Sequence, residues 1–232
     1  MVSMKMNKQK QIVIGLIAAI ASAGCELDNY KMPDLTLSGR IVDASTGELV
    51  ESGGINGGTI VQLFEYSDTQ PQNLTTFPDG TFVNSRIFPG NYTYTAVGPF
   101  TLVNPDRVAL AIKGNTDIDI EVLPHVRLKI TEVTVNGTSA TVKVAYEKVN
   151  DTQTLSRIGV AWNTYQNPNI LSVGAGKFQE EQVESLDLES GEREYTIDGL
   201  AAGEINYIRA FARTNNPGNY YNYSSQVTQQ IN

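Results

Sequence analysis

The sequence predicts an all-β protein with two tandem β-sandwich domains behind a signal segment. From about residue 35 onward, apolar and polar residues alternate, and no apolar repeat of 3.6 residues runs through this part. Gly, Asn, Asp and Pro interrupt the alternation at short intervals, which is typical of strands joined by turns. The chain has 232 residues, 41% of them hydrophobic, which is enough for two small cores.

Residues 1–24 have the order of a signal peptide that ends at a cysteine. Lysines precede the apolar run 12–20, which is too short for a membrane-spanning helix of ~20 residues. Small residues then precede Cys25, the only cysteine of the chain. This order resembles the lipobox of bacterial lipoproteins, although Ser22 stands where that motif usually has Leu. The resemblance implies cleavage before Cys25, a lipid on Cys25, a linker over 25–33 and a protein anchored in the outer membrane at the cell surface.

Alternating segments between residues 34 and 123 predict the strands of a first domain. They are 35–43, 59–66, 81–83, 92–96 and 117–122. The Gly-rich stretch 53–58 between two of them is expected to be a flexible loop. The motifs SGRIVD at 38–43, DGTF at 79–82 and FPGNY at 88–92 resemble, in this order, the carboxypeptidase-regulatory-like family. The resemblance implies a transthyretin-like β-sandwich over residues 34–123.

A second domain is expected over residues 126–232, after a short boundary at 123–126. Because this boundary is short, we expect the two domains to abut and to flex little. The strand-like segments of the second domain are 126–135, 139–148, 156–164, 193–198, 205–214 and 221–229.

The stretch LAAGEINYIRA at 200–210 resembles a fibronectin type III segment. The resemblance implies a tyrosine corner, in which the hydroxyl of Tyr207 bonds the backbone near Gly203. Trp162 is predicted to be a core residue, because Ile158 shares its face by alternation. These features predict a fibronectin/immunoglobulin-like sandwich for the second domain.

A lipoprotein signal followed by a transthyretin-like and an immunoglobulin-like domain resembles a group of two-domain outer-membrane lipoproteins of uncharacterised function. The resemblance implies an accessory role in glycan capture, with a glycan or an outer-membrane importer complex as partner besides the membrane. The alternative is a structural or pilin-like, adhesive surface subunit. A binding protein should present a concave patch of exposed aromatic and amide side chains. A structural subunit should present an exposed unpaired strand edge or a groove that accepts a partner strand.

The composition argues against several other classes of protein. The formal charge of −8 disfavours nucleic acid as a partner. One cysteine and one histidine allow neither an internal disulfide nor a Cys/His zinc site. A Ser-His-Asp triad would have to use His125 at the domain boundary, and the chain has neither a G-x-S-x-G motif nor a phosphate-binding loop. We therefore expect no enzymatic activity and no cofactor.

Tyrosines among amide side chains are the candidate ligand-binding residues. Tyr220, Tyr221 and Tyr223 lie among Asn and Ser in the last loop, and Tyr165 follows the strand that carries Trp162. Aromatic rings stack on the apolar faces of sugars, while amides bond the hydroxyls. Because Tyr221 and Tyr223 share one face of a strand, they are both exposed or both buried. Burial of this pair would remove the expected platform.

Three acids on one predicted strand are the nearest candidate for a metal site. Alternation places Asp117, Asp119 and Glu121 on one face, with Ile118 and Ile120 directed inward. Three carboxylates could hold Ca²⁺, which takes oxygen ligands. A solvated outer face of a half-buried strand shows the same pattern, so we expect no metal here.

Overall fold

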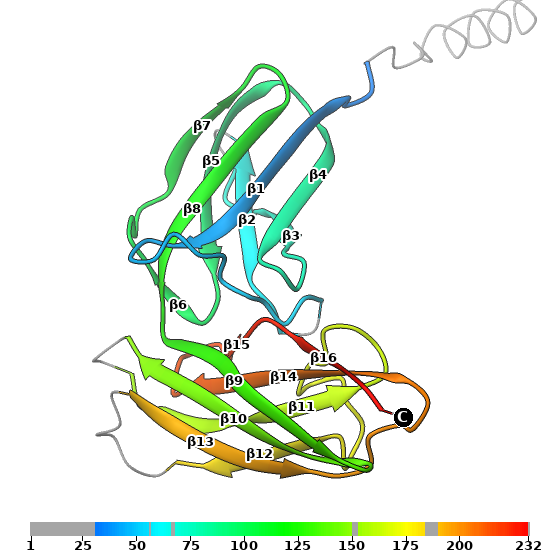
Figure 1. Cartoon of the computed structure of the whole chain (residues 1–232). Helices are drawn as coiled ribbons and strands as arrows, with labels where there is room; N and C mark the ends of the chain where they lie inside the picture. The colour runs from blue at the N-terminus through cyan, green and yellow to red at the C-terminus, as the bar shows by residue number, and fades with distance from the viewer. Residues whose placement is uncertain (1–30, 56, 66–67, 150–152, 184–189, 232) are drawn as a thin grey trace, which may run out of the picture. The chain divides into compact units, whose positions relative to one another are not determined.

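The computed structural model describes residues 31–55, 57–65, 68–149, 153–183 and 190–231, and Cys25 with the predicted signal segment lies outside them. The described residues form strands, turns and loops without a helix, and they make up two sandwich-like groups of sheets (Figure 1). The predicted all-β class of two tandem sandwiches is confirmed. A search of the described part of the chain for an apolar helix of membrane-spanning length finds none.

The first sandwich consists of two four-stranded sheets. One sheet has the order β4-β1-β8-β6 and the other has the order β3-β2-β5-β7. The strands are β1 (Leu35–Asp43), β2 (Ile60–Glu65), β3 (Gln72–Thr75), β4 (Thr81–Ile87), β5 (Gly90–Val97), β6 (Phe100–Leu102), β7 (Val108–Ile112) and β8 (Thr116–Pro124). Of these, β3, β6 and β7 were not predicted: β3 and β6 have only 4 and 3 residues, and β7 is apolar throughout, so that none of them shows a clear alternation.

The core of the first sandwich follows the alternation in its strands. Leu37 and Ile41 of β1 and Ile120 of β8 are buried between the sheets. Strands β1 and β8 pair in parallel, so that Gly39 lies beside Ile118. A Cβ atom at Gly39 would lie 2.3 Å from the carbonyl oxygen of Ile118 and 2.5 Å from the ring of Phe82. Glycine at this position therefore allows the Phe82 ring to pack against the backbone.

The second sandwich consists of a three-stranded and a five-stranded sheet. The orders are β13-β10-β9 and β12-β11-β14-β15, with β16 also paired to β14. The strands are β9 (Val126–Asn136), β10 (Ser139–Lys148), β11 (Leu155–Asn163), β12 (Phe178–Gln182), β13 (Ser190–Ile197), β14 (Ile205–Thr214), β15 (Tyr221–Tyr223) and β16 (Val227–Gln230). Trp162 lies in the core between these sheets beside Val160 and Ile208, as predicted.

The predicted tyrosine corner at Tyr207 is wrong. The side chain of its neighbour Asn206, and not the Tyr207 hydroxyl, bonds the backbone of the preceding turn. The Asn206 side chain is buried; its Oδ1 accepts from the Ala201 amide at 2.9 Å, and its Nδ2 donates to the Ala201 and Glu204 carbonyls at 3.0 and 3.2 Å. Tyr207 lies on the opposite face of β14, half-exposed. The first sandwich does contain such a corner, because the hydroxyl of Tyr92 donates to the Phe88 carbonyl at 3.0 Å.

Candidate ligand-binding site

The last loop and β15 lie at the junction of the two sandwiches, where most of the expected platform is buried. Tyr221 and Tyr223 are only 5% and 6% exposed. The Tyr221 ring packs edge-on against Phe211, with 5.8 Å between centroids, and the Tyr223 hydroxyl donates to Oδ1 of Asn169 at 3.0 Å. The expectation of an exposed Tyr221–Tyr223 platform is therefore wrong.

The cause of this burial is a second layer over the outer face of the five-stranded sheet. Phe211, Tyr221 and Tyr223 form one cluster with Val173 of the loop after β11. The Nδ2 of Asn169 in that loop donates to the carbonyl of Gly53 in the first sandwich at 2.5 Å. This hydrogen bond fixes Gly53 against the second sandwich, whereas the Gly-rich sequence around it predicted a flexible loop.

A buried ion pair joins the two sandwiches beneath this layer. Arg209 of β14 is fully buried; its Nη2 donates to Glu51 at 2.8 Å and to the Pro78 carbonyl at 3.0 Å. Its Nε donates to the Ser224 carbonyl, and its guanidinium lies 4.5 Å from the centre of the Tyr223 ring. Burial lowers the pKa of Arg209 and raises that of Glu51, while their mutual attraction opposes both changes. The Arg209–Glu51 pair therefore links the two sandwiches, because removing either partner would leave the other charge buried without compensation.

A second ion pair joins the two sandwiches between β1 and β9. The guanidinium of Arg127 in β9 contacts both carboxylate oxygens of Asp43 in β1, at 2.6 and 3.1 Å, and it also donates to Glu147. Burial tends to raise the pKa of Asp43, but the hydrogen bonds from Arg127 and the Ser45 amide outweigh it and hold that pKa below its usual value. This pair fixes the start of β9 against the end of β1.

His125, expected as a boundary residue, is buried in this junction. Its backbone amide donates to the Pro99 carbonyl at 2.9 Å, and its Nδ1 lies 3.1 Å from the Thr214 hydroxyl. Burial lowers the pKa of His125. The side chain of Asn222 joins the same network, because its Nδ2 donates to the Pro99 carbonyl and its Oδ1 accepts from the Val126 amide.

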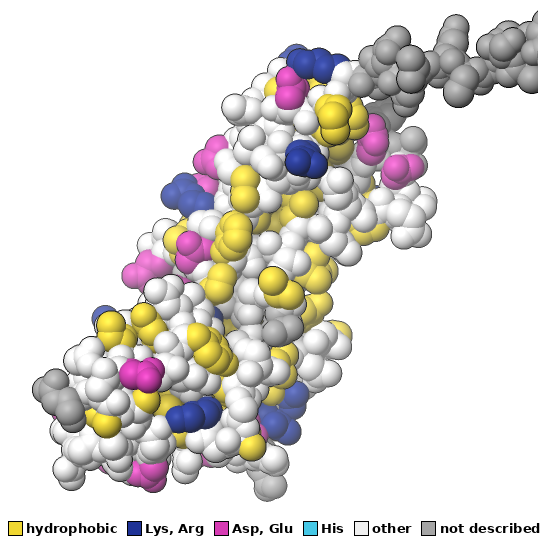
Figure 2. All heavy atoms as spheres, turned by 90° about the vertical axis from the view of Figure 1, so that its right-hand side faces the viewer, with side chains coloured by type: hydrophobic (Ala, Val, Ile, Leu, Met, Phe, Trp, Pro, Cys, Tyr) yellow, Lys and Arg dark blue, Asp and Glu magenta, His cyan; other side chains and the backbone are white. Residues whose placement is uncertain are grey.

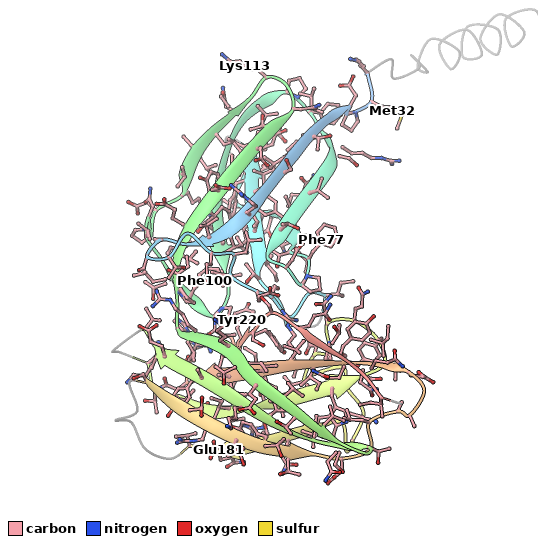
Figure 3. All side chains as sticks on the ribbon, viewed as in Figure 1. Met32, Phe77, Phe100, Lys113, Glu181 and Tyr220 are labelled. Carbon is pink, nitrogen blue, oxygen red and sulfur yellow. The ribbon has the colours of Figure 1, made fainter. Side chains whose placement is uncertain are left out.

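An open groove of about 350 Å³ remains at the junction. The first sandwich contributes Phe100 and Leu102 of β6, and the second contributes Gln153, Asn216 and Tyr220. Figure 3 shows Phe100 and Tyr220 close to the junction, on chain segments from the two sandwiches. A volume of this size lies within the ~300–1,000 Å³ range of ligand pockets. The groove thus brings aromatic and amide side chains together in a concave site.

The chain holds Tyr220 in a fixed position on the wall of this groove. Asn216 accepts from the Tyr220 amide at 2.8 Å and donates to the Tyr220 carbonyl at 2.9 Å. The Tyr220 ring lies against Gly218, where a Cβ atom would come within 1.8 Å of the ring. Glycine at 218 therefore makes room for the ring, and the braced loop leaves Tyr220 half-exposed.

Gln153 also lines this groove. Its Oε1 is buried and has no hydrogen-bond partner among the residues that the structure describes. Nothing in the sequence pattern pointed to Phe100 and Leu102 of β6 or to Gln153 before β11, because these two segments are brought together only by the fold.

The other candidate residues do not join this groove. Tyr165 is 43% exposed in the loop after β11 and does not line it. The acids of β8 point outward as alternation predicted, but Asp117 accepts from the Ser38 hydroxyl at 2.7 Å and Asp119 pairs with Arg40 at 2.6 Å. Within the described ranges, no group of three His, Cys, Asp or Glu side chains could hold a metal ion.

A second cavity of about 230 Å³ lies in the first sandwich and shares only Leu102 with the described lining of the junction groove. Its polar lining includes Tyr94, Asn104, Asp106, Asp119 and Glu121. The pKa of the Tyr94 hydroxyl is raised by burial. This cavity is acidic, whereas the described residues that line the junction groove include no Lys, Arg, Asp or Glu.

Exposed apolar side chains form a further surface feature. Ile55, Phe77 and Leu171 are 90%, 52% and 55% exposed. Figure 3 places Phe77 on the side that faces the viewer in Figure 2, where hydrophobic side chains form a broken row. This row offers apolar area for a protein contact rather than hydrogen-bond partners for sugar hydroxyls.

Comparison with known proteins matches the first sandwich to a family of unknown function. Residues 35–123 match the family described as "Protein of unknown function (DUF3823) N-terminal domain". A DUF3823 family protein from Bacteroides uniformis ATCC 8492 is 20% identical, with a TM-score of 0.73, over 86% of this chain and 100% of that chain. One from Parabacteroides merdae ATCC 43184 is 21% identical, with a TM-score of 0.70 over the same shares. The resemblance to two-domain proteins of uncharacterised function is thus confirmed.

A further similar structure carries a functional description. A candidate carbohydrate binding protein from Bacteroides uniformis ATCC 8492 is 22% identical, with a TM-score of 0.67, over 86% of this chain and all of that chain. No curated protein matches the chain. At these identities the structural similarity shows a shared fold.

Proposed function

We propose that this protein is a non-enzymatic lipoprotein of the cell surface that captures glycan at the outer membrane, in the groove at the sandwich junction. The observation that carries the proposal is the partly exposed ring of Tyr220, braced by Asn216 and Gly218 in a groove that Phe100 and Gln153 also line. A fixed aromatic ring stacks on a sugar face with little loss of side-chain entropy. The similar structure described as a candidate carbohydrate binding protein supports the same class of ligand.

Affinity electrophoresis against a panel of polysaccharides tests the proposal. At least one polysaccharide should retard the native protein, and Tyr220→Ala should abolish most of the retardation by removing the stacking surface. Tyr165→Ala is the matched control, because it removes an exposed tyrosine that does not line the groove. Equal loss in both variants, or retardation that survives Tyr220→Ala, would contradict the assignment to the groove.

The lipid anchor is the second part of the proposal. The order of charge, apolar run and small residues before Cys25 supports lipidation, which would place the folded part at the membrane without a membrane-facing surface of its own. Cys25→Ala should move the protein from the membrane fraction to the soluble fraction. Unchanged fractionation of this variant would overturn the anchor.

A structural or adhesive subunit is the second candidate function, favoured by one observation. Strand β4 ends its sheet and pairs only with β1 among the described strands, so its other edge can accept a strand. This function predicts concentration-dependent polymers that Ser85→Pro in the middle of β4 abolishes. A monomer at all concentrations in size-exclusion chromatography would argue against it.

A further inference from the structure

The junction groove differs from its surroundings in charge. The residues that line it include two amides, a tyrosine, a threonine and several apolar side chains, and none of the described lining residues is Lys, Arg, Asp or Glu. The single titratable imidazole of the lining belongs to His125, which is buried and bonded to Thr214. The described lining of the groove thus combines polar and stacking side chains and carries no formal charge at neutral pH.

Two arginines that join the sandwiches, Arg209 and Arg127, are already paired with carboxylates. Arg209 is fully buried against Glu51, and Arg127 contacts both Asp43 and Glu147. Neither guanidinium can turn to a ligand without breaking an ion pair that joins the sandwiches. The chain as a whole carries a formal charge of −8, so it repels polyanions at long range.

We propose that the groove selects uncharged polysaccharides and rejects those that carry carboxylate or sulfate groups. This inference rests on the proposed glycan-binding function and names the substrate class of the same site. A neutral sugar can place its apolar face on the Tyr220 ring and keep its hydroxyl groups among uncharged lining residues. An anionic sugar would lose hydration at its charged group and find no cation in return.

Two sets of polysaccharides test the selection by affinity electrophoresis. Starch, xylan and galactomannan form the neutral set; polygalacturonate, alginate and chondroitin sulfate form the anionic set. We expect at least one neutral polysaccharide to retard the protein in a manner that requires Tyr220, and each anionic one to bind at least tenfold more weakly. Retardation by a polyanion that Tyr220→Ala abolishes would overturn the selection and leave glycan binding intact. Retardation by none of the six would overturn both.

A charge substitution at the rim of the groove gives an independent test. Thr101 is exposed and lines the groove, so Thr101→Lys adds a cation there, whereas Thr101→Gln adds similar length without charge. Polygalacturonate should bind the lysine variant at least tenfold more tightly than the native protein. It should bind the glutamine variant no more tightly than the native protein. An unchanged lysine variant would show that charge does not cause the rejection. Binding of the neutral ligand should change less than about twofold between 50 and 500 mM NaCl, because screening acts on charged pairs.

Discussion

The outer faces of β8 and of β14–β15 both point away from the core between the sheets. The outer face of β8 is exposed to solvent, whereas that of β14–β15 is largely buried. On β8, Asp117 and Asp119 point into solvent and pair with neighbours on β1. On β14 and β15, Arg209 and Tyr223 also point away from the core between the sheets, yet a loop and the first sandwich cover them. Alternation therefore tells which residues share a face, and only the tertiary arrangement tells whether that face meets water.

The largest expected effect is the difference in stability loss between breaking the buried ion pair on β14 and breaking the exposed ion pair on β8. Glu51→Ala leaves the guanidinium of Arg209 buried and unpaired, so we expect a loss of ~3–5 kcal/mol in the free energy of unfolding. Asp119→Ala removes the partner of Arg40, whose side chain is 51% exposed, and should leave stability unchanged within error. Denaturation with guanidinium chloride measures both. Equal losses would show that the junction does not shield its pair from water.

The corner of the second sandwich is expected to give the next largest effect. Asn206→Ala removes three hydrogen bonds and leaves buried backbone groups unpaired, at a cost of about 2–3 kcal/mol. Tyr207→Phe should cost nothing measurable, because the described residues offer its hydroxyl no hydrogen bond. Thermal melts measure both losses. A larger loss for Tyr207→Phe than for Asn206→Ala would support the tyrosine corner that the sequence predicted.

A pH dependence should follow from the burial of His125. Burial lowers its pKa in the folded protein, so the unfolded chain takes up the proton first as the pH falls below ~6.5. Stability should therefore fall toward acid from this residue, by up to about 1.4 kcal/mol per pH unit while only the unfolded form is protonated. The difference between wild type and His125→Gln in melts from pH 7.5 to 5 measures this contribution. A constant difference would place the imidazole in contact with water.

The smallest expected effect concerns the buried tyrosine of β15. Tyr223→Phe removes one hydrogen bond to Asn169, worth about 1 kcal/mol, while the ring stays in its cluster. Tyr165→Phe on the exposed loop should change nothing. Urea titration of both variants provides the comparison, and a larger loss for Tyr165 would mean that the burial of the two tyrosines is reversed.

The sequence predicted what depends on local pattern. Trp162 was placed in the core because its neighbours alternate with it, and the acids of β8 were placed outside for the same reason. The pairing of Tyr221 with Tyr223 on one face was also predicted, but their burial was not. That burial needs Asn169 from one loop and Glu51 from the other sandwich, which lie far away in the sequence.

The groove shows the same limit. Tyr220 was a candidate from its composition, since tyrosine among asparagines suits sugar contact. Phe100 and Gln153, which line the same groove, come from a three-residue strand and from a loop, where no periodicity marks a residue as functional. Long-range contacts of this kind carry no signal in a single sequence.

The measurement that tests the central claim most directly is hydrogen–deuterium exchange with and without a polysaccharide that retards the protein. Because the groove is built from both sandwiches, we expect slower amide exchange in two separate segments, 96–102 and 216–220, when the glycan is bound. Protection confined to the segments around Tyr94 and Asp106, or to the loop that carries Tyr165, would place the ligand elsewhere and contradict the account.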